Sequence, residues 1–287
     1  MFALIGFFIV TSAVIGGYLL EHGNLNMLIQ PAELVIIGGA ALGAFFISAP
    51  QKVITIVARD LASFFKTEKS DKKTYLDLML LLYEILVKAR KEGLLSIESD
   101  LKEPEKSPVF SKYTAITANK RVSEFLYDSL RIIIASEMQP ATLENLLDTD
   151  IDTRQEEALI SSHCLTRIAD SLPGLGIVAA VLGVVLTMSK INEPPAVLGH
   201  SIGAALVGTF LGVLLCYGFV GPVGYNLAYK AKEEENFLNV IKSSLVAFLD
   251  NAVPPLALET GRRAIPSKDR PSSQELEDAI REWKKTK

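Results

Sequence analysis

The chain has 287 residues, of which 49% are apolar and 22% are charged, and its formal net charge at pH 7 is -4. Its mean hydropathy is +0.30. A uniformly hydrophobic transporter carries fewer charges, so the composition excludes that class. The mixture favours a membrane part joined to a sizeable soluble part.

Four apolar stretches are long enough to cross a bilayer at a window of about 20 residues. They are Phe2–Leu20, Leu34–Ala49, Leu172–Met188 and Gly199–Tyr225. The second and third have short apolar cores, so we expect both to extend into flanking residues. The first has no Lys or Arg before it and no A-x-A cleavage site after it, which predicts a retained helix and not a signal peptide.

The last two spans are rich in small residues and contain no carboxylate. Those residues are Gly176, Ala179, Ala180 and Gly183 in the third span and Gly203, Gly208 and Gly212 in the fourth. Small side chains let helix backbones approach closely where lipid gives no hydrophobic drive. Glycine and proline are permitted in spans only where neighbouring helices stabilise them. We therefore expect these spans to face protein, in a molecule that works by assembly.

The basic residues predict the orientation of the spans. The connections Glu21–Pro31 and Asn192–Leu198 contain no Lys or Arg. Every Lys and Arg except Lys190 lies in Gln51–Asp170 or after Ala228. The positive-inside rule places those two segments and both termini in the cytoplasm. Cys164 and Cys216 then lie inside the cell or inside a span, so we expect no disulfide.

The large connection Gln51–Asp170 has a helical pattern, which predicts a small helical domain. One apolar stripe comprises Leu76, Met79, Leu80, Tyr83, Leu86 and Val87, with Asp77, Glu84, Lys88 and Lys91 on the opposite face. Gly93 suits the end of that helix. Arg90 lies in its last turn, where it is either a cation favoured by the helix dipole or a contact residue.

Two further helices are expected in this connection. A second stripe comprises Val122, Phe125, Leu126, Leu130 and Ile133, and Pro140 closes it. A third helix is predicted to start near Thr142 and to enter the membrane near Leu172. Its first part is acidic, with Glu144, Asp148, Asp150, Asp152, Glu156 and Glu157 against the single Arg154. Such a face is either solvated or meets a basic partner.

The chain after the last span is predicted to be cytoplasmic and helical. Ala228–Glu235 reads as a continuation of the last span, and Pro254–Pro255 as a break. Gly261–Pro271 is expected to be a loose linker. Ser272 and Glu275 form a capping-box pattern that opens a short amphipathic helix. Its inward side chains are expected to be Leu276, Ala279, Ile280 and Trp283.

No nucleotide-binding loop, metal cluster or nucleophile pattern is found, so enzyme functions have no residues to carry them. His22, His163 and His200 lack ligand-like spacing. His22 and His200 lie near the outer face, and we interpret them as interfacial residues in preference to proton carriers. The segment Gly208–Gly212 reads as a helix-packing signal, because no strand precedes it and no Lys follows.

The spans offer hydroxyls but no carboxylate near mid-membrane. Hydroxyls occur at Thr187, Ser201, Thr209 and Tyr217. Each can bond to a carbonyl of its own helix or line a polar path. Glu33 lies only at the outer end of the second span. A proton or sodium path normally needs an ionisable group near mid-membrane, so if this protein conducts ions, we expect another polypeptide to supply it.

Four motifs follow one another in order along the chain. They are QPAELVIIGG at Gln30–Gly39, DSLPGLGIVAAVLGVV at Asp170–Val185, VGTFLGVLLCYGF at Val207–Phe219 and RPSSQELE at Arg270–Glu277. Together with four spans and one large connection between the second and third, they resemble the flagellar motor stator A subunit family (MotA), of the MotA/TolQ/ExbB proton channel superfamily. The resemblance covers nearly the whole chain.

This resemblance implies an all-α, four-span membrane protein of the bacterial inner membrane with a helical cytoplasmic domain. The expected divisions are residues 1–50 and 171–227 for the spans, 51–170 for the cytoplasmic domain and 228–287 for the cytoplasmic tail. Five copies would assemble around two MotB-type B subunits, each anchored to peptidoglycan and carrying the missing aspartate. The implied function is non-enzymatic, with no cofactor: proton conduction converted into torque on the rotor.

The resemblance also implies roles for single residues. Pro173 and Pro222 match prolines thought to link ion passage to movement of the cytoplasmic domain. Thr209 matches a hydroxyl near the partner's aspartate, and Tyr217 lies further along that helix, where it could border the path. Arg90 and Glu98 match the charged positions that engage the rotor's switch protein, FliG, which favours a contact role for Arg90.

Ala180 indicates which ion is carried. Relatives that use sodium tend to have a threonine at this place, seven residues after the first proline. Alanine offers no oxygen ligand, and protons need no such cage, so proton coupling is expected.

Two rival functions stay open at this point. The ExbB and TolQ type of energising complex shares a polar path between small-residue helices, but it usually has three spans and starts outside. A secondary transporter would call for an intramembrane ionisable residue or broken helices in both halves, and neither is seen.

Overall fold

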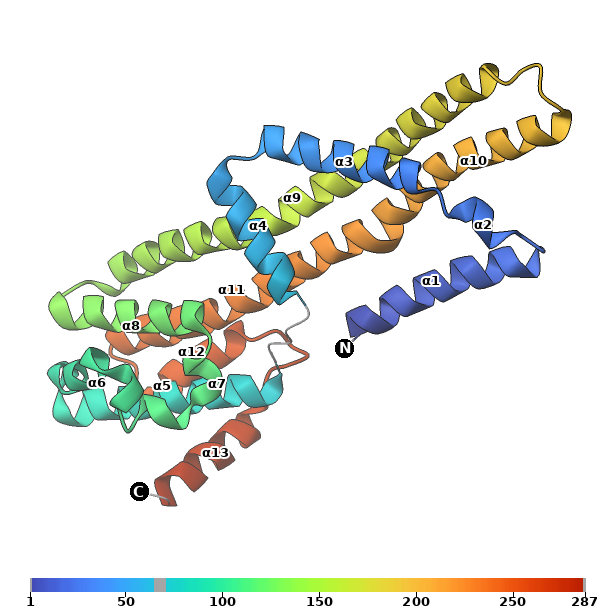
Figure 1. Cartoon of the computed structure of the whole chain (residues 1–287). Coiled ribbons are helices and arrows are strands. Elements are labelled where there is room, and N and C mark those ends of the chain that lie inside the picture. Colours follow the sequence, from blue (N-terminus) through green and yellow to red (C-terminus); the bar gives the residue numbers. More distant parts are fainter. Residues whose placement is uncertain (1, 65–70, 286–287) are drawn as a thin grey trace. The chain divides into compact units, whose positions relative to one another are not determined.

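A computed structural model describes residues 2–64 and 71–285 of the chain, and every regular element in these ranges is helical (Figure 1). The chain divides into two compact units. The first comprises Met1–Thr67 and Ala158–Tyr229, and we call it the span unit. The second comprises Glu68–Glu157 and Lys230–Lys287, and we call it the charged unit. The all-helical fold class predicted from the sequence is confirmed.

Four helical segments in the described ranges are long and apolar enough to cross a membrane, as expected. The first is α1 (Phe2–Leu20), and the second is α3 (Pro31–Ser48), preceded by the short α2 (Leu25–Leu28). The third is the end of α9 (Pro140–Met188), a helix of 49 residues. The fourth is formed by α10 (Pro195–Leu214), the π-helical turn η4 (Leu215–Val220) and α11 (Gly221–Leu249).

The span boundaries follow local chemistry. Pro31 and Pro195 each stand in the first turn of their helix, where a missing N–H leaves no bond unmade. The second span therefore begins earlier than its apolar core, as expected. Helix α4 (Gln51–Ser63) belongs to the span unit, and its Val57 is buried with Leu165 and Val223. Ser161 also donates a hydrogen bond to Asp60 at 2.6 Å.

The charged unit is built around α5 (Lys72–Glu92). Its other elements are η1 (Leu94–Ile97), α6 (Glu98–Lys102), η2 (Pro104–Lys106), η3 (Phe110–Lys112), α7 (Thr114–Thr117), α8 (Lys120–Ala135), α12 (Pro254–Ala264) and α13 (Ser273–Lys285). The N-terminal part of α9, up to Glu157, and the C-terminal part of α11, from Lys230, also belong to it. Asp71 caps α5 by accepting a hydrogen bond from the Thr74 N–H at 2.9 Å. Gly93 ends it at φ 85°, a conformation that favours glycine.

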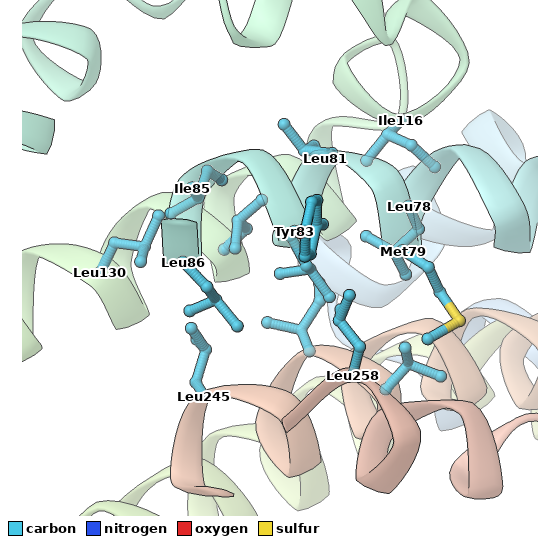
Figure 2. Close-up of a cluster of buried hydrophobic side chains, with 14 of the residues drawn as sticks. Leu78, Met79, Leu81, Tyr83, Ile85, Leu86, Ile116, Leu130, Leu245 and Leu258 are labelled. Atoms are coloured by element: carbon cyan, nitrogen blue, oxygen red, sulfur yellow. The ribbon is translucent and has the colours of Figure 1, made fainter. Parts of the chain in front are cut away.

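The core of this unit surrounds α5, so the helix has no broad polar face. Figure 2 shows side chains such as Leu78 and Leu86 of α5 beside Leu130 of α8, Leu245 of α11 and Leu258 of α12. The sequence pattern placed Glu84 on a polar face, and that expectation was wrong. Glu84 is buried because α13 and Lys112 cover it.

The segment Gly261–Pro271 is ordered, which corrects the expectation of a loose linker. Helix α12 continues to Ala264, and Ile265 is fully buried. The Arg262 guanidinium donates to the Pro271 carbonyl at 2.9 Å, and that of Arg270 to the Ile265 carbonyl at 2.9 Å. Two arginines thereby satisfy backbone oxygens that a turn would otherwise leave open to solvent. The expected capping box is present, with Ser272 and Glu275 bonded reciprocally at 3.1 and 2.6 Å.

Candidate site between the long helices

Helices α9 and α10 meet backbone to backbone. A Cβ atom placed on Gly176 would lie 2.7 Å from the Gly208 carbonyl oxygen and 3.1 Å from Gly212 Cα. A Cβ atom on Gly212 would lie 2.6 Å from the Leu172 carbonyl oxygen. No side chain fits at these positions, because the obstructing atoms are main chain. The small residues noted in the sequence are therefore the contact surface itself.

The same close contact continues above and below this level. A Cβ on Gly183 would lie 2.6 Å from Ala205 Cβ, and one on Gly224 would lie 3.0 Å from Thr166 Oγ1. This part of α9 thus lies along α10 and the start of α11 over a long distance, as the ribbons in Figure 1 show. Contact of this length makes the two helices one element to which other helices can attach.

Ala180 and Thr209, two residues expected to border the ion path, lie at one level of this helix pair. A Cβ on Gly208 would be 3.1 Å from the Ala180 amide nitrogen. A Cβ on Gly176 would be 3.3 Å from Thr209 Cα. Both Ala180 and Thr209 are half-buried. The structure therefore brings these two together, with their main-chain atoms in the contact surface and each residue half-buried.

Pro173, Tyr217 and Pro222 lie further along the same helices. Pro173 is inside α9 and half-buried, whereas Pro222 is exposed and directly follows the π-helical turn η4. Tyr217 projects from η4 with 73% of its surface exposed. A π-helical turn widens the helix locally and frequently marks functional sites. Pattern reasoning did not predict this turn, because no residue in LCYGFV requires it.

Helix α1 packs against η4. The rings of Phe7 and Phe219 stack with their centroids 5.4 Å apart. A Cβ on Gly218 would lie 3.1 Å from Val10 Cγ1. Aromatic stacking and a small residue thus hold the widened turn against the first span.

Glu33 is the residue that sequence reasoning underrated. It lies in the first turn of α3 but is only 8% exposed. A Cβ on Gly208 would lie 2.6 Å from Glu33 Oε2, and one on Gly183 would lie 3.7 Å from Oε1. Gly208 is in the interior of α10, so Glu33 is not confined to the outer end of the helix group. The available signal was the spacing of Glu33, Ile37 and Ala41, which form the buried stripe of α3.

Arg90 and Glu98, expected to contact the rotor, lie close in sequence in the charged unit and are both exposed. Glu98 forms an ion pair with Lys102, with Oε1 and Nζ 3.0 Å apart, and both side chains are more than half exposed. The neighbouring Asp100 is buried, where it binds Lys88 at 2.6 Å and Ser107 at 2.7 Å. These inner bonds hold the short α6 in place, so Glu98 is carried on an ordered support.

The acidic start of α9 is partly neutralised within the charged unit. Asp148 pairs with Lys242 of α11 at 2.5 Å, and Asp150 pairs with Arg154 at 2.8 Å. These carboxylates are therefore neither purely solvated nor wholly available to a basic partner. Among the residues the structure describes, no cluster of His, Cys, Asp and Glu could hold a metal ion.

The long apolar helices and their glycine-lined contact define a class: a polytopic helical membrane protein. Family profiles agree in detail. Residues 4–93 match "Motility protein A N-terminal", and residues 117–239 match "MotA/TolQ/ExbB proton channel family". The chain belongs to the motility protein A family. The resemblance predicted from sequence motifs is thus confirmed, and with it the assignment to the stator subunits of the flagellar motor.

Curated relatives match along almost their whole length. Motility protein A of Salmonella typhimurium and that of Escherichia coli are each 41% identical over 281 residues, covering 98% of this chain and 95% of theirs. Chemotaxis protein LafT of Vibrio parahaemolyticus is 34% identical over 278 residues, covering 97% of this chain and 98% of its own.

Two solved structures share the fold. One is described as the structure of C. jejuni MotAB, with a TM-score of 0.78, 19% identity, and coverage of 94% of this chain and 98% of that one. The other is the flagellar MotAB stator complex from Bacillus subtilis, with a TM-score of 0.76, 23% identity, and coverage of 93% and 97%.

Proposed function

We propose that this chain is the A subunit of a flagellar stator in the bacterial inner membrane. With a MotB-type B subunit that supplies an aspartate, it conducts protons and converts their passage into torque. The observation that carries the proposal is the close contact of α9 and α10 through glycine and alanine, which sets Ala180 beside Gly208, the chain neighbour of Thr209. The membership of the motility protein A family supports the same conclusion.

The faces of α9 and α10 that point away from their mutual contact can pack against further helices. Exposed apolar side chains on them include Ile177, Val181, Val185, Leu206 and Val213. In lipid such faces need no partner, but the spanning parts of α9 and α10 carry no carboxylate of their own, so they must meet another helix that supplies one to conduct. We propose a homo-oligomer of five copies around two B helices, as the family resemblance implies. The two solved structures of the same fold are described as MotAB complexes, which supports assembly with a B subunit.

Each path residue has a proposed role that its position permits. Thr209 supplies a hydroxyl beside the partner's aspartate, and Tyr217 borders the path further along. Ala180 offers a methyl group and no oxygen, so the site lacks the extra ligand a sodium ion needs, and the carried ion is the proton. Pro173 and Pro222 each remove one backbone N–H from a continuous helix, and we propose that these weak points transmit the change. No cofactor and no catalytic reaction are proposed.

The charged unit is proposed to face the rotor. Residues 51–170 and 228–287 are assigned to the cytoplasm, with both termini, because they hold the basic residues. Arg90 and Glu98 are exposed and carry opposite charges, which suits an electrostatic contact with FliG. Such a contact sets orientation and encounter rate more than it holds the partners together.

The ExbB and TolQ type of energising subunit is less well supported. The proton channel profile at residues 117–239 covers those proteins by its description, but residues 4–93 match a profile of motility protein A. The secondary transporter has no comparable support.

The test is a flux measurement in membrane vesicles. Vesicles with this chain alone should conduct few protons, and co-expression of the B subunit should raise the flux. Each proton crossing delivers ~2.3 kcal/mol per 100 mV, enough for a few ions to drive a sizeable change. In cells without their own A subunit, the chain should restore swimming that stops when the proton gradient is collapsed. Equal flux from the chain alone, or speed that follows sodium at a fixed proton gradient, would overturn the proposal.

A further inference from the structure

The span unit contains a buried carboxylate that the proposed mechanism does not use. Glu33 is 8% exposed, and its Oε2 atom has no hydrogen-bond partner in the parts of the chain that the structure describes. Buried polar groups are almost always bonded, so each exception asks for an explanation. A buried carboxylate without a donor is the costlier case, because its charge loses water and gains nothing in return.

The walls around Glu33 are glycine and alanine. From α10, Gly208 brings only its Cα against Oε2, and Ala205 lies beside Gly183 of α9. Thr187 of α9 is also buried near this end, but its hydroxyl donates to the Gly183 carbonyl at 2.8 Å. Within α3, Ile37 follows Glu33 on the buried stripe. These neighbours provide no hydrogen-bond donor for the carboxylate. They also provide no further oxygen atoms that could help Glu33 to bind a metal cation.

Charged and titratable groups on the packed elements lie outside this niche. Helix α3 has no other charged residue, and α9 has none between Asp170 and Lys190. Lys190 is exposed and donates to Ser201 Oγ at 3.3 Å. The titratable side chain on α10 is the exposed His200, and α2 has none. In the described residues, no charged side chain of α2, α3, α9 or α10 thus faces Glu33. A cation that neutralises Glu33 must therefore come from outside the niche.

We propose that Glu33 is a proton-binding group of this chain itself, held between α3, α9 and α10 at the level of Ala180 and Thr209. The proton comes from water: a carboxylate and a hydronium ion give the carboxylic acid and water. The protonated acid is neutral and fits the niche of glycine and alanine around Oε2. The ionised form needs water at Oε2 as well, so α3 must separate from the glycine surface to admit it. Proton occupancy therefore controls the packing of α3. The inference rests on the proposed function for its proton path.

The experiment detects the carboxylic acid directly. The complex of this chain with its B subunit is reconstituted in lipid vesicles at neutral pH, with glutamate labelled by ¹³C at its side-chain carboxyl. Infrared spectra then separate a protonated glutamic acid from the partner's aspartic acid. We expect one labelled C=O band that shifts in D2O and is absent in Glu33→Gln. The control Glu193→Gln, at an exposed residue of the outer connection, should leave the band unchanged.

A second variant guards against failed assembly. Glu33→Asp keeps a carboxyl group but removes the glutamate label, so the band should move to its unlabelled position. Proton flux through assembled Glu33→Gln complexes should fall about tenfold, the change that ~1.4 kcal/mol in the barrier makes. The band is lost with Glu33 whatever its role, so the flux is the deciding readout: an assembled Glu33→Gln complex with wild-type flux would reduce Glu33 to a structural acid.

The outcomes separate this inference from the proposed function. An assembled wild-type complex with partner-dependent flux but no glutamic acid band at neutral pH would sink the role of Glu33 alone. A Glu33 band in a complex that shows no partner-dependent flux would leave the proton-binding group standing and overturn the proposed proton conduction with the B subunit.

Discussion

The indole Nε1 of Trp283 donates a hydrogen bond to the Glu84 carboxylate at 3.1 Å, which ties the C-terminal helix α13 to the middle of α5. The other oxygen of Glu84 binds the Lys112 ammonium at 2.8 Å. The Trp283 ring also meets Tyr83 edge to face, with centroids 5.2 Å apart. One buried carboxylate thus joins three segments that are far apart in the sequence.

Removing the charge of Glu84 should destabilise the charged unit. In Glu84→Gln, the Lys112 and Trp283 groups lose a charged acceptor, and lost hydrogen bonds of this kind cost about 1–3 kcal/mol. The fluorescence of Trp283, the one tryptophan in the chain, should report earlier thermal unfolding. Glu92→Gln, at the exposed end of α5, is the matched control and should behave as wild type. Equal stability of the two variants would contradict the role given to Glu84.

Filling the contact between α9 and α10 should disrupt the span unit. In Gly212→Ala the new methyl group meets the Leu172 carbonyl and the Gly176 backbone, which cannot move aside cheaply, so we expect a loss of about 1–3 kcal/mol. Gly174→Ala is the control, because a Cβ there has nothing within 4 Å and alanine favours a helix. Thermal unfolding in detergent, followed by helical circular dichroism, should separate the two. Similar melting of both variants would argue against backbone contact.

Acid should weaken the charged unit through Glu259. Hydrogen bonds from Arg262, at 2.7 Å to each oxygen, lower the pKa of Glu259 from 4.5 to about 2. A lowered pKa in the fold contributes stability that is present above about 4.5 and is lost as pH falls towards 2. Trp283 fluorescence should show this decline, and Glu259→Gln should be less stable at neutral pH with a flatter dependence in this window. An unchanged slope in the variant would assign the decline to other groups.

Reversing both of the charges proposed to contact the rotor should impair torque and leave assembly intact. Arg90→Glu with Glu98→Lys keeps the net charge but inverts the local pattern, whereas each single neutralisation should be mild, since exposed pairs are worth about 0–1 kcal/mol. Swimming speed and pull-down with the B subunit are the measurements. Asp278→Lys with Arg281→Glu reverses an exposed pair on α13 and is the control. Normal swimming of the Arg90 and Glu98 double reversal would reduce both residues to helix-end charges.

Replacing Pro173 should uncouple ion passage from movement. Proline inside α9 has no N–H for the Ala169 carbonyl, and this weak point can act as a hinge. Pro173→Leu should yield an assembled complex that does not swim. Pro195→Leu is the control, because Pro195 lies in the first turn of α10, where no N–H is needed. An assembled Pro173→Leu complex that swims normally would show the proline to be a structural kink only.

Local patterns were sufficient for the helices themselves. The span Phe2–Leu20 forms α1 with the same bounds, Gly93 ends α5, and the capping box of Ser272 and Glu275 opens α13. Each depends on residues a few positions apart: an uninterrupted apolar run, a glycine at positive φ, and a pair three residues apart. Such interactions form within one segment, so the sequence by itself determines them. The glycine-rich faces of α9 and α10 also predicted that these helices pack closely against other helices.

Tertiary structure alone decided where the carboxylates lie. The sequence predicted Glu33 at the outer end of the second span. In the structure, α3 packs against α10 so that the Glu33 side chain contacts Gly208. Glu84 was on a polar face by periodicity, yet α13, almost two hundred residues later, covers it. Burial of a charge depends on which distant segments cover it and on the partners they bring, and no local periodicity carries that information.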